Sequence, residues 1–488
     1  MVIRTIDEAR EAGRLRWFAP AIERLRSLSH DADPSVASFF IADLPVTIAR
    51  APGRLDVMGG IADYSGSLVL EMPLACATTA VAQQQDELRL DILSFRGDRA
   101  FTFSMDMAPV AEGPGDMLAA WFDEWRDDRW PAYVAGSVHA CLTSAGVWRP
   151  RRGLRLLLTS DVPEGKGVSS SAALEVATMS ATAACYSIPV DGWSLATACQ
   201  WAENHIAGAP CGIMDQMTSA LGLRDRLLRL RCQPAIVEGH VTVPPGYRFY
   251  GIDSGVRHAV SGSDYGTVRT AAFMGYRMIA ELVGLRATSD GGRVRVEDAR
   301  WNGYLANIEP GEFSSRFADR LPERARGAEF LERYGGITDV ATRVDPDRWY
   351  AVRASTAHPV FENDRVTRFA ELLSTGLGRA DSAREMGALM LESHRSYSSC
   401  GLGSEGTDHL VVLVSEVGES AGLFGAKITG GGSGGTVAVL GSDTAHSAVH
   451  HVAERYERET GRTAYVFDGS GPGSEELGVL VIPSVSRA

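Results

Sequence analysis

A glycine-rich loop that opens a helix is the segment of this chain best suited to chemistry. The run SDVPEGKGVSSSAALEVA occupies residues 160–177, and its three serines begin a helix of small residues. A helix N-terminus offers unpaired N–H groups and a partial positive charge, so such a loop favours phosphate binding. It is not a Walker A motif, which would need glycine at Ser160 and serine or threonine at Gly167. A serine-capped helix is the simpler alternative, but three serines exceed what a cap needs.

A second segment places charged residues where the chain leaves an apolar strand. APGRLDVMGGIADYSG at 51–66 brings Arg54, Asp56 and Asp63 within ten residues, beside a glycine-rich turn. Taken alone, the segment is explained more simply as a tight hairpin, because paired glycines supply the positive φ angles that a turn needs. The density of charge between two apolar strands keeps a functional role open.

A third segment, AENHIAGAPCGIMDQMTSALG at 202–222, contains two carboxylates. Glu203 ends one helix, and Asp215 lies in an otherwise apolar run beside two methionines. Burying an unpaired carboxylate is costly, so Asp215 is a candidate functional residue. A helix cap or a structural ion pair explains Asp215 equally well from this segment alone. No histidine, His205 included, has zinc-ligand spacing, and the sequence therefore predicts no zinc site.

A second glycine-rich loop, GAKITGGGSGG, occupies residues 425–435. Gly430, Gly432 and Gly435 match the dinucleotide-binding pattern G-x-G-x-x-G, but that fingerprint requires a helix directly after the glycines. Here the strand-like run 436–440 follows instead. We therefore interpret the loop as a flexible turn whose bare backbone can approach a ligand closely.

Together these segments suit magnesium-dependent phosphoryl transfer. That chemistry requires a phosphate cradle, neutralisation of charge and a group that orients the attacking hydroxyl. Mg²⁺ prefers hard oxygen ligands, which a serine hydroxyl and a carboxylate provide.

Composition limits the other classes of function. The 488 residues include 48 Lys and Arg and 61 Asp and Glu, and a net charge of −13 without a basic patch argues against nucleic-acid or anionic-lipid partners. The seven cysteines form no C-x-x-C pair, so we expect no disulfide framework. The sequence shows neither a signal peptide nor a membrane-spanning apolar stretch, and we expect a cytoplasmic protein.

The elements that must position these residues indicate an α+β fold. Helical apolar spacing is found at residues 5–29, at about 169–185, 193–206 and 212–221, and over most of 264–400. Short apolar and β-branched runs that suit strands begin near Leu44. From residue 424 onward the pattern predicts strand, strand, helix, strand and strand. We expect mixed sheets in two lobes that meet near Pro244–Tyr250.

The three motifs resemble those of the GHMP small-molecule kinases, in the order of that family. APGR and DYSG resemble the galactokinase signature, GKGVSSSAALEVA the family's phosphate loop, and KITGGGSGG its C-terminal glycine loop. GAPCGIMDQ, and DSGVRH at 253–258, are also similar to galactokinases. Within the family, VMGGIADYSGSLVL, ENHIAGAPCGIMDQMTS and SYSSCGLGSEGT at 396–407 resemble the kinase domain of plant L-arabinokinases. Those proteins carry a large N-terminal domain ahead of this region. The present sequence does not include that domain, so we expect a stand-alone kinase.

The resemblance implies a two-lobed GHMP kinase fold, with a mixed α/β N-terminal lobe and a ferredoxin-like C-terminal lobe. We expect a helical extension at 1–36, the N-terminal lobe at 37–247 and the C-terminal lobe, with the glycine loop 425–435, at 248–488. The implied reaction transfers phosphate from ATP, with Mg²⁺, to the 1-hydroxyl of a sugar. ATP and the sugar are the expected partners, and the oligomeric state stays open.

The resemblance also assigns roles residue by residue. Ser171 and Glu203 would hold Mg²⁺. Asp215 would accept or orient the proton of the anomeric hydroxyl, and Arg54 would hold Asp215 ionised. The ATP-binding residues would be Gly165, Lys166, Gly167, Val168, Ser169, Ser170, Ser171 and Trp130, the last of which is equally well explained as a core aromatic. The sugar-binding residues would be Arg54, Gly60, Ile61, Asp63, Gly212, Asp215 and Tyr265. The glycine loop would contribute Gly430, Gly431, Gly432 and Gly434.

Gly60 and Ile61 bear on the choice of sugar. Galactokinases carry Glu-His at these positions, near the sugar's 6-hydroxyl, and L-arabinose lacks the group that bears it. Polar groups of the protein left unpaired against the pentose can lower kcat/KM by a factor of about 10⁴. We therefore expect L-arabinose as substrate with D-galactose as a minor one, and we expect Gly60→Glu with Ile61→His to favour galactose. Alternatively, Gly60 serves the turn and Ile61 packs inward. A galactokinase and a non-catalytic sugar sensor on the same fold are the competing functions.

Overall fold

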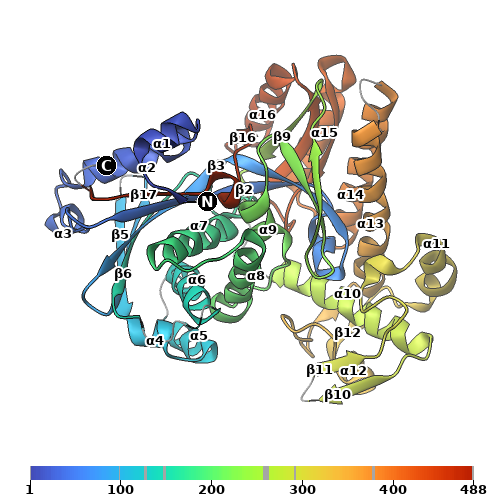
Figure 1. The fold of residues 1–488 in the computed structure, drawn as a ribbon. Coiled ribbons are helices and arrows are strands. Elements are labelled where there is room, and N and C mark those ends of the chain that lie inside the picture. The colour runs from blue at the N-terminus through green and yellow to red at the C-terminus, as the bar shows by residue number, and fades with distance from the viewer. Residues whose placement is uncertain are drawn as a thin grey trace.

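Two β-sheets organise the chain (Figure 1). The structure is a computed structural model that describes residues 2–97, 99–125, 129–144, 146, 150–256, 263–290, 293–375 and 380–485. Within these ranges, one sheet has nine strands and another has four, and two smaller ribbons have two strands each.

The large sheet has the strand order β1-β17-β2-β3-β6-β4-β5, and β7 and β8 extend from β3. Its strands are β1 (Val2–Ile3), β2 (Val46–Met58), β3 (Leu68–Gln85), β4 (Arg89–Arg96), β5 (Arg99–Asp106), β6 (Gly153–Ser160), β7 (Arg226–Arg231), β8 (Ile236–Thr242) and β17 (Val479–Ile482). The pairs β1–β17 and β4–β6 are parallel, and the others are antiparallel.

Alternation along the central strands gives each face of this sheet its own core. Ala49 and Leu156 belong to the cluster formed with one layer of helices, whereas Ile48 and Leu157 belong to the cluster that contains Phe18. Successive side chains of a strand point to opposite faces, and β2 is buried along its whole length because both faces are covered. The covering helices are α2 (Leu15–Leu28) on one face and α6 (Trp130–Ser144), α7 (Ser170–Cys185), α8 (Gly192–Ala202) and α9 (Met214–Leu221) on the other. Helices α7, α8 and α9 confirm the stretches expected near 169–185, 193–206 and 212–221.

The smaller sheet confirms the expected ferredoxin-like arrangement. Its antiparallel strands have the order β14-β15-β9-β16, which is 2-3-1-4 along the chain, and helices separate the first from the second and the third from the fourth. The elements are β9 (Tyr247–Asp253), β14 (Leu423–Ile428), β15 (Thr436–Ser442), α16 (His446–Thr460) and β16 (Tyr465–Asp468). The strand at β15 also confirms that the glycine loop leads into a strand.

Long helices lie between β9 and β14 of the smaller sheet along the chain and occupy the right half of Figure 1. They are α10 (Ser263–Leu282), α13 (Val352–Thr375), α14 (Ala380–Ser399) and α15 (Glu405–Val417). Leu55 and Val57 of β2 share a cluster with Phe369 of α13, Leu389 of α14 and Leu440 of β15, so the two lobes have a common core. The shorter elements are α1 (Ile6–Glu11), α3 (Pro34–Ala37), α4 (Met107–Ala111), α5 (Gly115–Glu124), β10 (Ala287–Asp290), β11 (Arg293–Val296), α11 (Pro310–Glu312), β12 (Ala325–Arg326), α12 (Gly327–Tyr334), β13 (Trp349–Tyr350) and α17 (Ser474–Leu477).

Two expectations need correction at the ends of the chain. The single helix expected at 5–29 is two helices, α1 and α2, because Gly13 adopts a left-handed φ of 67° and ends the first one. Residues 479–482, expected in the C-terminal lobe, pair instead with β2 in the large sheet. An apolar strand pattern does not specify which sheet the strand joins. The division into 1–36, 37–247 and 248–488 otherwise stays a prediction.

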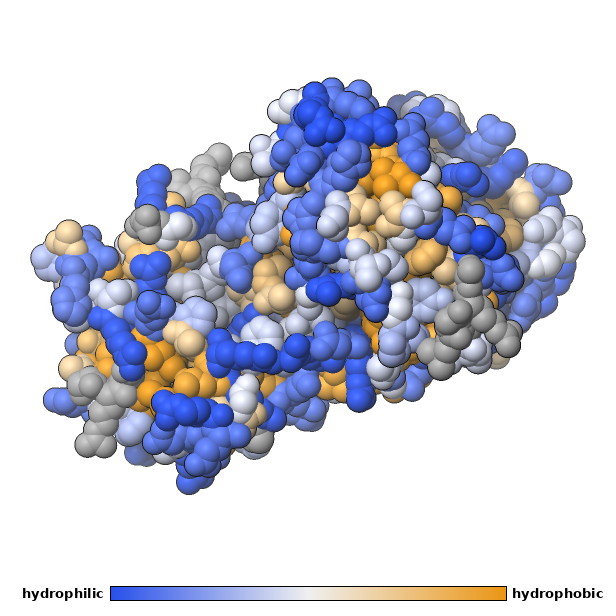
Figure 2. Space-filling model, turned by 90° about the horizontal axis from the view of Figure 1, so that it is seen from above, coloured by the Kyte–Doolittle hydropathy of each residue, from blue (hydrophilic) through white to orange (hydrophobic). Residues whose placement is uncertain are grey.

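The surface is predominantly hydrophilic in the view of Figure 2, with separate hydrophobic patches between charged residues. Among the described helices, none combines the length and the apolar character needed to span a bilayer.

Candidate active site

Strand β2 brings Arg54 into a buried cluster of charge. Arg54 is 2% exposed, and its Nε and Nη2 donate to Oδ1 of Asp215 at 2.9 and 2.5 Å. Its Nη1 donates to the carbonyl oxygen of Gly167 at 3.1 Å, and Glu71 Oε2 lies 3.2 Å from Nε. Burial alone would lower the pKa of Arg54, but the charges of Asp215, Glu71 and Asp56 outweigh it and raise that pKa. Arg54 thus stays a cation that joins Asp215 to the phosphate loop.

The phosphate loop is held in an unusual backbone conformation at the start of α7. Gly165, Gly167 and Ser169 have left-handed φ angles of 69°, 72° and 60°. Such a conformation is uncommon for serine and is found preferentially at functional sites. The side chain of Lys166 forms an ion pair with the buried Asp253 of β9. The carbonyl oxygen of Lys166 accepts a hydrogen bond from Thr436 Oγ1 at 2.8 Å. The loop therefore bridges the two lobes.

The two predicted magnesium ligands lie together beneath this loop. The Ser171 hydroxyl lies beside the Glu203 carboxylate and lowers its pKa. Gln216 Nε2 donates to Glu203 Oε2 at 2.5 Å and to Glu175 Oε2 at 3.1 Å. Burial raises the pKa of Glu203 to about 7, the charge of Asp215 adds to the effect, and the Ser171 hydroxyl opposes it.

These residues have the chemistry of a magnesium site. Glu175 is fully buried, and its Oε1 has no hydrogen-bond partner among the described residues. Burial, followed by the neighbouring charge of Glu203, raises the pKa of Glu175 well above its usual range. A hard divalent cation bound to the carboxylate and hydroxyl oxygens would compensate this charge. Glu203 begins a π-helical turn, Glu203–Ala207, and such turns are common at functional sites.

Two of the residues predicted to bind the sugar, Gly212 and Asp215, lie near Asp63. It lies in a 3-10 helix, η1 (Gly60–Ser65), directly after β2. A Cβ atom on Gly212 would lie 1.5 Å from Asp63 Oδ2, so Gly212 must be glycine for the two segments to meet. Asp63 Oδ1 is buried without a described partner. Burial and the charge of Asp215 raise the pKa of Asp63 to about 7, against the opposing effect of Arg269.

Tyr265 lies against this helix, and Ile61 is its second residue. The ring of Tyr265 meets Tyr64 edge-on, with centroids 5.8 Å apart. Ile61 is fully buried in the cluster that contains Tyr64, Val268 and Tyr397, which agrees with the alternative that Ile61 packs inward. Arg257 and His258 of the DSGVRH motif lie outside the described residues.

The second glycine loop needs its glycines for close approach to its neighbours. A Cβ on Gly430 would lie 2.8 Å from the Gly167 carbonyl oxygen, and one on Gly432 would lie 2.6 Å from the Leu402 Cβ. A Cβ on Gly434 would lie 3.0 Å from Val256, whereas for one on Gly431 the nearest described side chain is Tyr265, at 3.8 Å. The loop thus lies directly against the phosphate loop.

Comparisons with known proteins match both parts of this arrangement. A model of the GHMP kinases N terminal domain matches residues 132–223, and a model of the GHMP kinases C terminal region matches residues 373–458. Galactokinase of Chloroflexus aggregans is 31% identical over 86% of this chain and 90% of its own length. The chain belongs to the GHMP kinase family.

Other relatives of this GHMP kinase include an L-arabinokinase. The L-arabinokinase of Arabidopsis thaliana is 42% identical over 90% of the chain, which spans about half, 47%, of that protein's length. The crystal structure of Lactococcus lactis galactokinase complexed with galactose has a TM-score of 0.68 at 20% identity and covers 94% of this chain and 98% of its own. Mevalonate kinase of Methanococcus jannaschii has a TM-score of 0.53 at 13% identity over 87% and 97%. These structures confirm the expected GHMP kinase fold.

Sequence reasoning missed several buried residues of this GHMP kinase site: Glu175, Asp253, Arg269 and Tyr397. Glu175 follows Ser171 by four residues, a spacing that places both on one face of a helix, so it was recognisable. Asp253 and Tyr397 lie in the segments DSGVRH and SYSSCGLGSEGT, which assign them no role by themselves, and Arg269 has no local signal; all three reach the site through long-range packing. Trp130, the first residue of α6, is half-buried against the helical cluster, and its contact with adenine stays a prediction.

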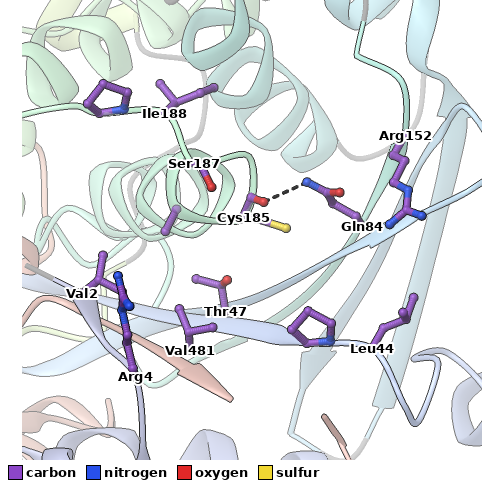
Figure 3. Close-up of a pocket in the computed structure, with 13 residues that line it drawn as sticks. Val2, Arg4, Leu44, Thr47, Gln84, Arg152, Cys185, Ser187, Ile188 and Val481 are labelled. Atoms are coloured by element: carbon purple, nitrogen blue, oxygen red, sulfur yellow. Dashed lines mark hydrogen bonds between the residues drawn. The ribbon is translucent and has the colours of Figure 1, made fainter. Parts of the chain in front are cut away.

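A separate cavity of about 510 Å³ opens elsewhere in this GHMP kinase (Figure 3). Arg4 and Arg152 border it, and Gln84 Nε2 donates to the Cys185 carbonyl oxygen across it at 2.8 Å. None of the residues predicted to bind ATP, Mg²⁺ or sugar lines this cavity. The candidate active site is therefore the cluster of residues from the three motifs, and this cavity is separate from it.

Proposed function

We propose that this chain is an ATP- and Mg²⁺-dependent sugar 1-kinase. The observation that carries the proposal is the Arg54–Asp215 pair, which Arg54 also connects to the Gly167 carbonyl of the phosphate loop. Phosphoryl transfer to a hydroxyl needs a group that orients the hydroxyl, next to a site that binds the phosphates. The pair and the loop supply both within one cluster.

In this proposal, residues 165–171 and the N-terminus of α7 bind the β- and γ-phosphates. Ser171 and Glu203 hold Mg²⁺, which when bound neutralises charge on the phosphates. Asp215 orients the anomeric hydroxyl and receives its proton, and Arg54 offsets charge on the transferred phosphoryl group. Because the transition state is loose, the proton can leave late, so orientation and base catalysis both fit Asp215.

L-Arabinose is the sugar that we propose as substrate. The 42% identity to an L-arabinokinase supports it, as does the Gly60–Ile61 pair, which places no polar side chain at the start of η1. Asp63 Oδ1, buried without a described partner, supports a hydrogen bond from a sugar hydroxyl. D-Galactose is the second candidate, favoured by the 31% identity to galactokinases.

An ADP-release screen tests this function. The protein is mixed with Mg·ATP and each of a set of pentoses, hexoses and uronic acids that includes L-arabinose and D-galactose. We expect ADP release that depends on the sugar and is fastest with L-arabinose. Binding of sugar without release of ADP would support the non-catalytic sensor instead.

A further inference from the structure

Gly60 and Tyr397 compete for the same space. A Cβ atom on Gly60 would lie 1.6 Å from the hydroxyl oxygen of Tyr397 and 2.7 Å from Asp56 Oδ2. Gly60 also has a left-handed φ of 46°, which disfavours other residues. Tyr397 reaches this point from α14 and is fully buried. While Tyr397 is present, position 60 has no room for a side chain.

The hydroxyl of Tyr397 connects two functional turns. It accepts a hydrogen bond from the Ile61 N–H at 2.8 Å and donates one to the Gly430 carbonyl oxygen at 3.0 Å. Burial raises the pKa of Tyr397 well above its usual range, so the hydroxyl keeps the proton that it donates. One side chain thus sets the distance between the start of η1 and the start of the glycine loop.

Asp56 holds the same two turns from the other side. Its Oδ1 accepts the Gly60 N–H at 3.0 Å, and its Oδ2 accepts the Gly430 N–H at 3.3 Å. Lys427, as fully buried as Asp56, donates to Oδ2 at 2.6 Å and places its ammonium group 5.2 Å from the centre of the Tyr397 ring. The turns are therefore clamped by Asp56 and Tyr397 together.

The position of the clamp matters because η1 carries Asp63. A 3-10 helix has three residues per turn, so Gly60 and Asp63 lie on the same side, one turn apart. A shift of Gly60 therefore moves the unpartnered Oδ1 of Asp63 as well.

We propose that Tyr397 is a positioning residue that determines sugar selectivity: its hydroxyl fills the volume of a side chain at position 60 and fixes the first turn of η1. The inference rests on the proposed function only for the choice of the two sugars, L-arabinose and D-galactose, that are compared. It also changes one expectation, because Gly60→Glu with Ile61→His would collide with Tyr397 and should inactivate the protein instead of favouring galactose.

Tyr397→Phe tests this assignment, because it removes the hydroxyl and keeps the ring in the core. The readout is the Kd of D-galactose divided by that of L-arabinose, by calorimetry, together with kcat/KM for L-arabinose divided by kcat/KM for D-galactose. We expect both ratios to fall about tenfold, the effect of hydrogen bonds worth about 1.4 kcal/mol. Tyr276→Phe is the matched control, because Tyr276 is also buried and, among the described residues, its hydroxyl bonds only to Asp298, away from the three motifs.

Gly60→Ala approaches the same contact from the other partner and is the second variant if Tyr397→Phe does not fold. Gly60→Ala should also change the Kd ratio and the kcat/KM ratio by several-fold, because its methyl group would displace the Tyr397 hydroxyl. Ratios within twofold of the original protein in the folded variants would overturn the assignment. If the original protein binds both sugars but releases no ADP, the proposed function fails, and the Kd ratio alone decides the role of Tyr397.

Discussion

Arg54 directs two guanidinium nitrogens at one oxygen of Asp215, with Nε 2.9 Å and Nη2 2.5 Å from Oδ1. No described residue donates a hydrogen bond to the other oxygen, Oδ2, and the side chain of Asp215 keeps 21% of its surface exposed. One oxygen is thus held by a buried cation, and the other is open to a substrate hydroxyl.

Asp215→Asn should abolish turnover while ATP still binds. The amide keeps the shape of the side chain but neither accepts a proton nor holds the charge that Arg54 pairs with. We expect kcat to fall by about 10²–10⁴-fold, measured by ADP release, with ATP affinity from calorimetry nearly unchanged. Asp225→Asn, on the surface, is the control. If the Asp215→Asn variant retains more than about a tenth of the original kcat, a central role for Asp215 is refuted.

Ser171→Ala and Glu203→Gln should weaken the use of Mg²⁺. Each removes an oxygen that we place on the cation, so the Mg²⁺ concentration for half-maximal activity should rise by about tenfold or more. Titration of Mg²⁺ at fixed ATP measures it, and Glu454→Gln on the exposed face of α16 serves as control. An unchanged Mg²⁺ requirement in both variants would place the metal elsewhere.

Lys166→Met should affect stability and ATP binding separately. It leaves the buried Asp253 without its cation, which should lower the free energy of unfolding, measured in urea, by about 3 kcal/mol. It should also raise the KM for ATP, because the ammonium group lies in the proposed phosphate loop. Adding Asp253→Asn should restore the stability but not the KM. If the double variant recovers both, Lys166 acts only as a partner of Asp253.

His358 should make the protein less stable in acid. Burial lowers its pKa to about 4, Arg365 and Lys427 add to the effect, and Glu362 opposes it. An unfolded chain binds this proton near pH 6.5, so between about pH 6.5 and 4 protonation favours unfolding, by up to about 3 kcal/mol. Urea unfolding should show that His358→Gln loses less stability than the original protein from pH 7 to 4. His450→Gln, on the surface, should lose as much as the original protein, and equal losses in all three would contradict the assignment.

Much of the fold could be predicted from local pattern. Apolar spacing located α7, α8 and α9 and the four strands of the smaller sheet, because periodicity reflects which face is buried. It did not reveal the break at Gly13, since Phe18, Ile22 and Leu25 continue a helical pattern beyond it. Nor could it place β17 beside β2, because strand pairing over such a distance depends on the whole assembled sheet.

The candidate site, like the fold, could be predicted from the sequence only in part. Arg54 and Asp215 lie in separate motifs, and the structure brings them together as the family resemblance implied. Tyr397 lies in the segment 396–407 that resembles L-arabinokinases, but its role could not be found from the sequence, because it meets Gly60 and Ile61 only through the packing of α14, 336 residues along the chain from Ile61. The difference between Gly-Ile and the Glu-His of galactokinases was recognisable in the sequence, but the contact of Gly60 with Tyr397 was not.

The most direct test of the central claim is kcat/KM for L-arabinose and D-galactose with Mg·ATP, with the product examined by ³¹P NMR. We expect a sugar 1-phosphate from both, with L-arabinose favoured by about tenfold or more. A preference for galactose would replace the proposed substrate, and the absence of any sugar-dependent phosphate ester would contradict the sugar 1-kinase itself.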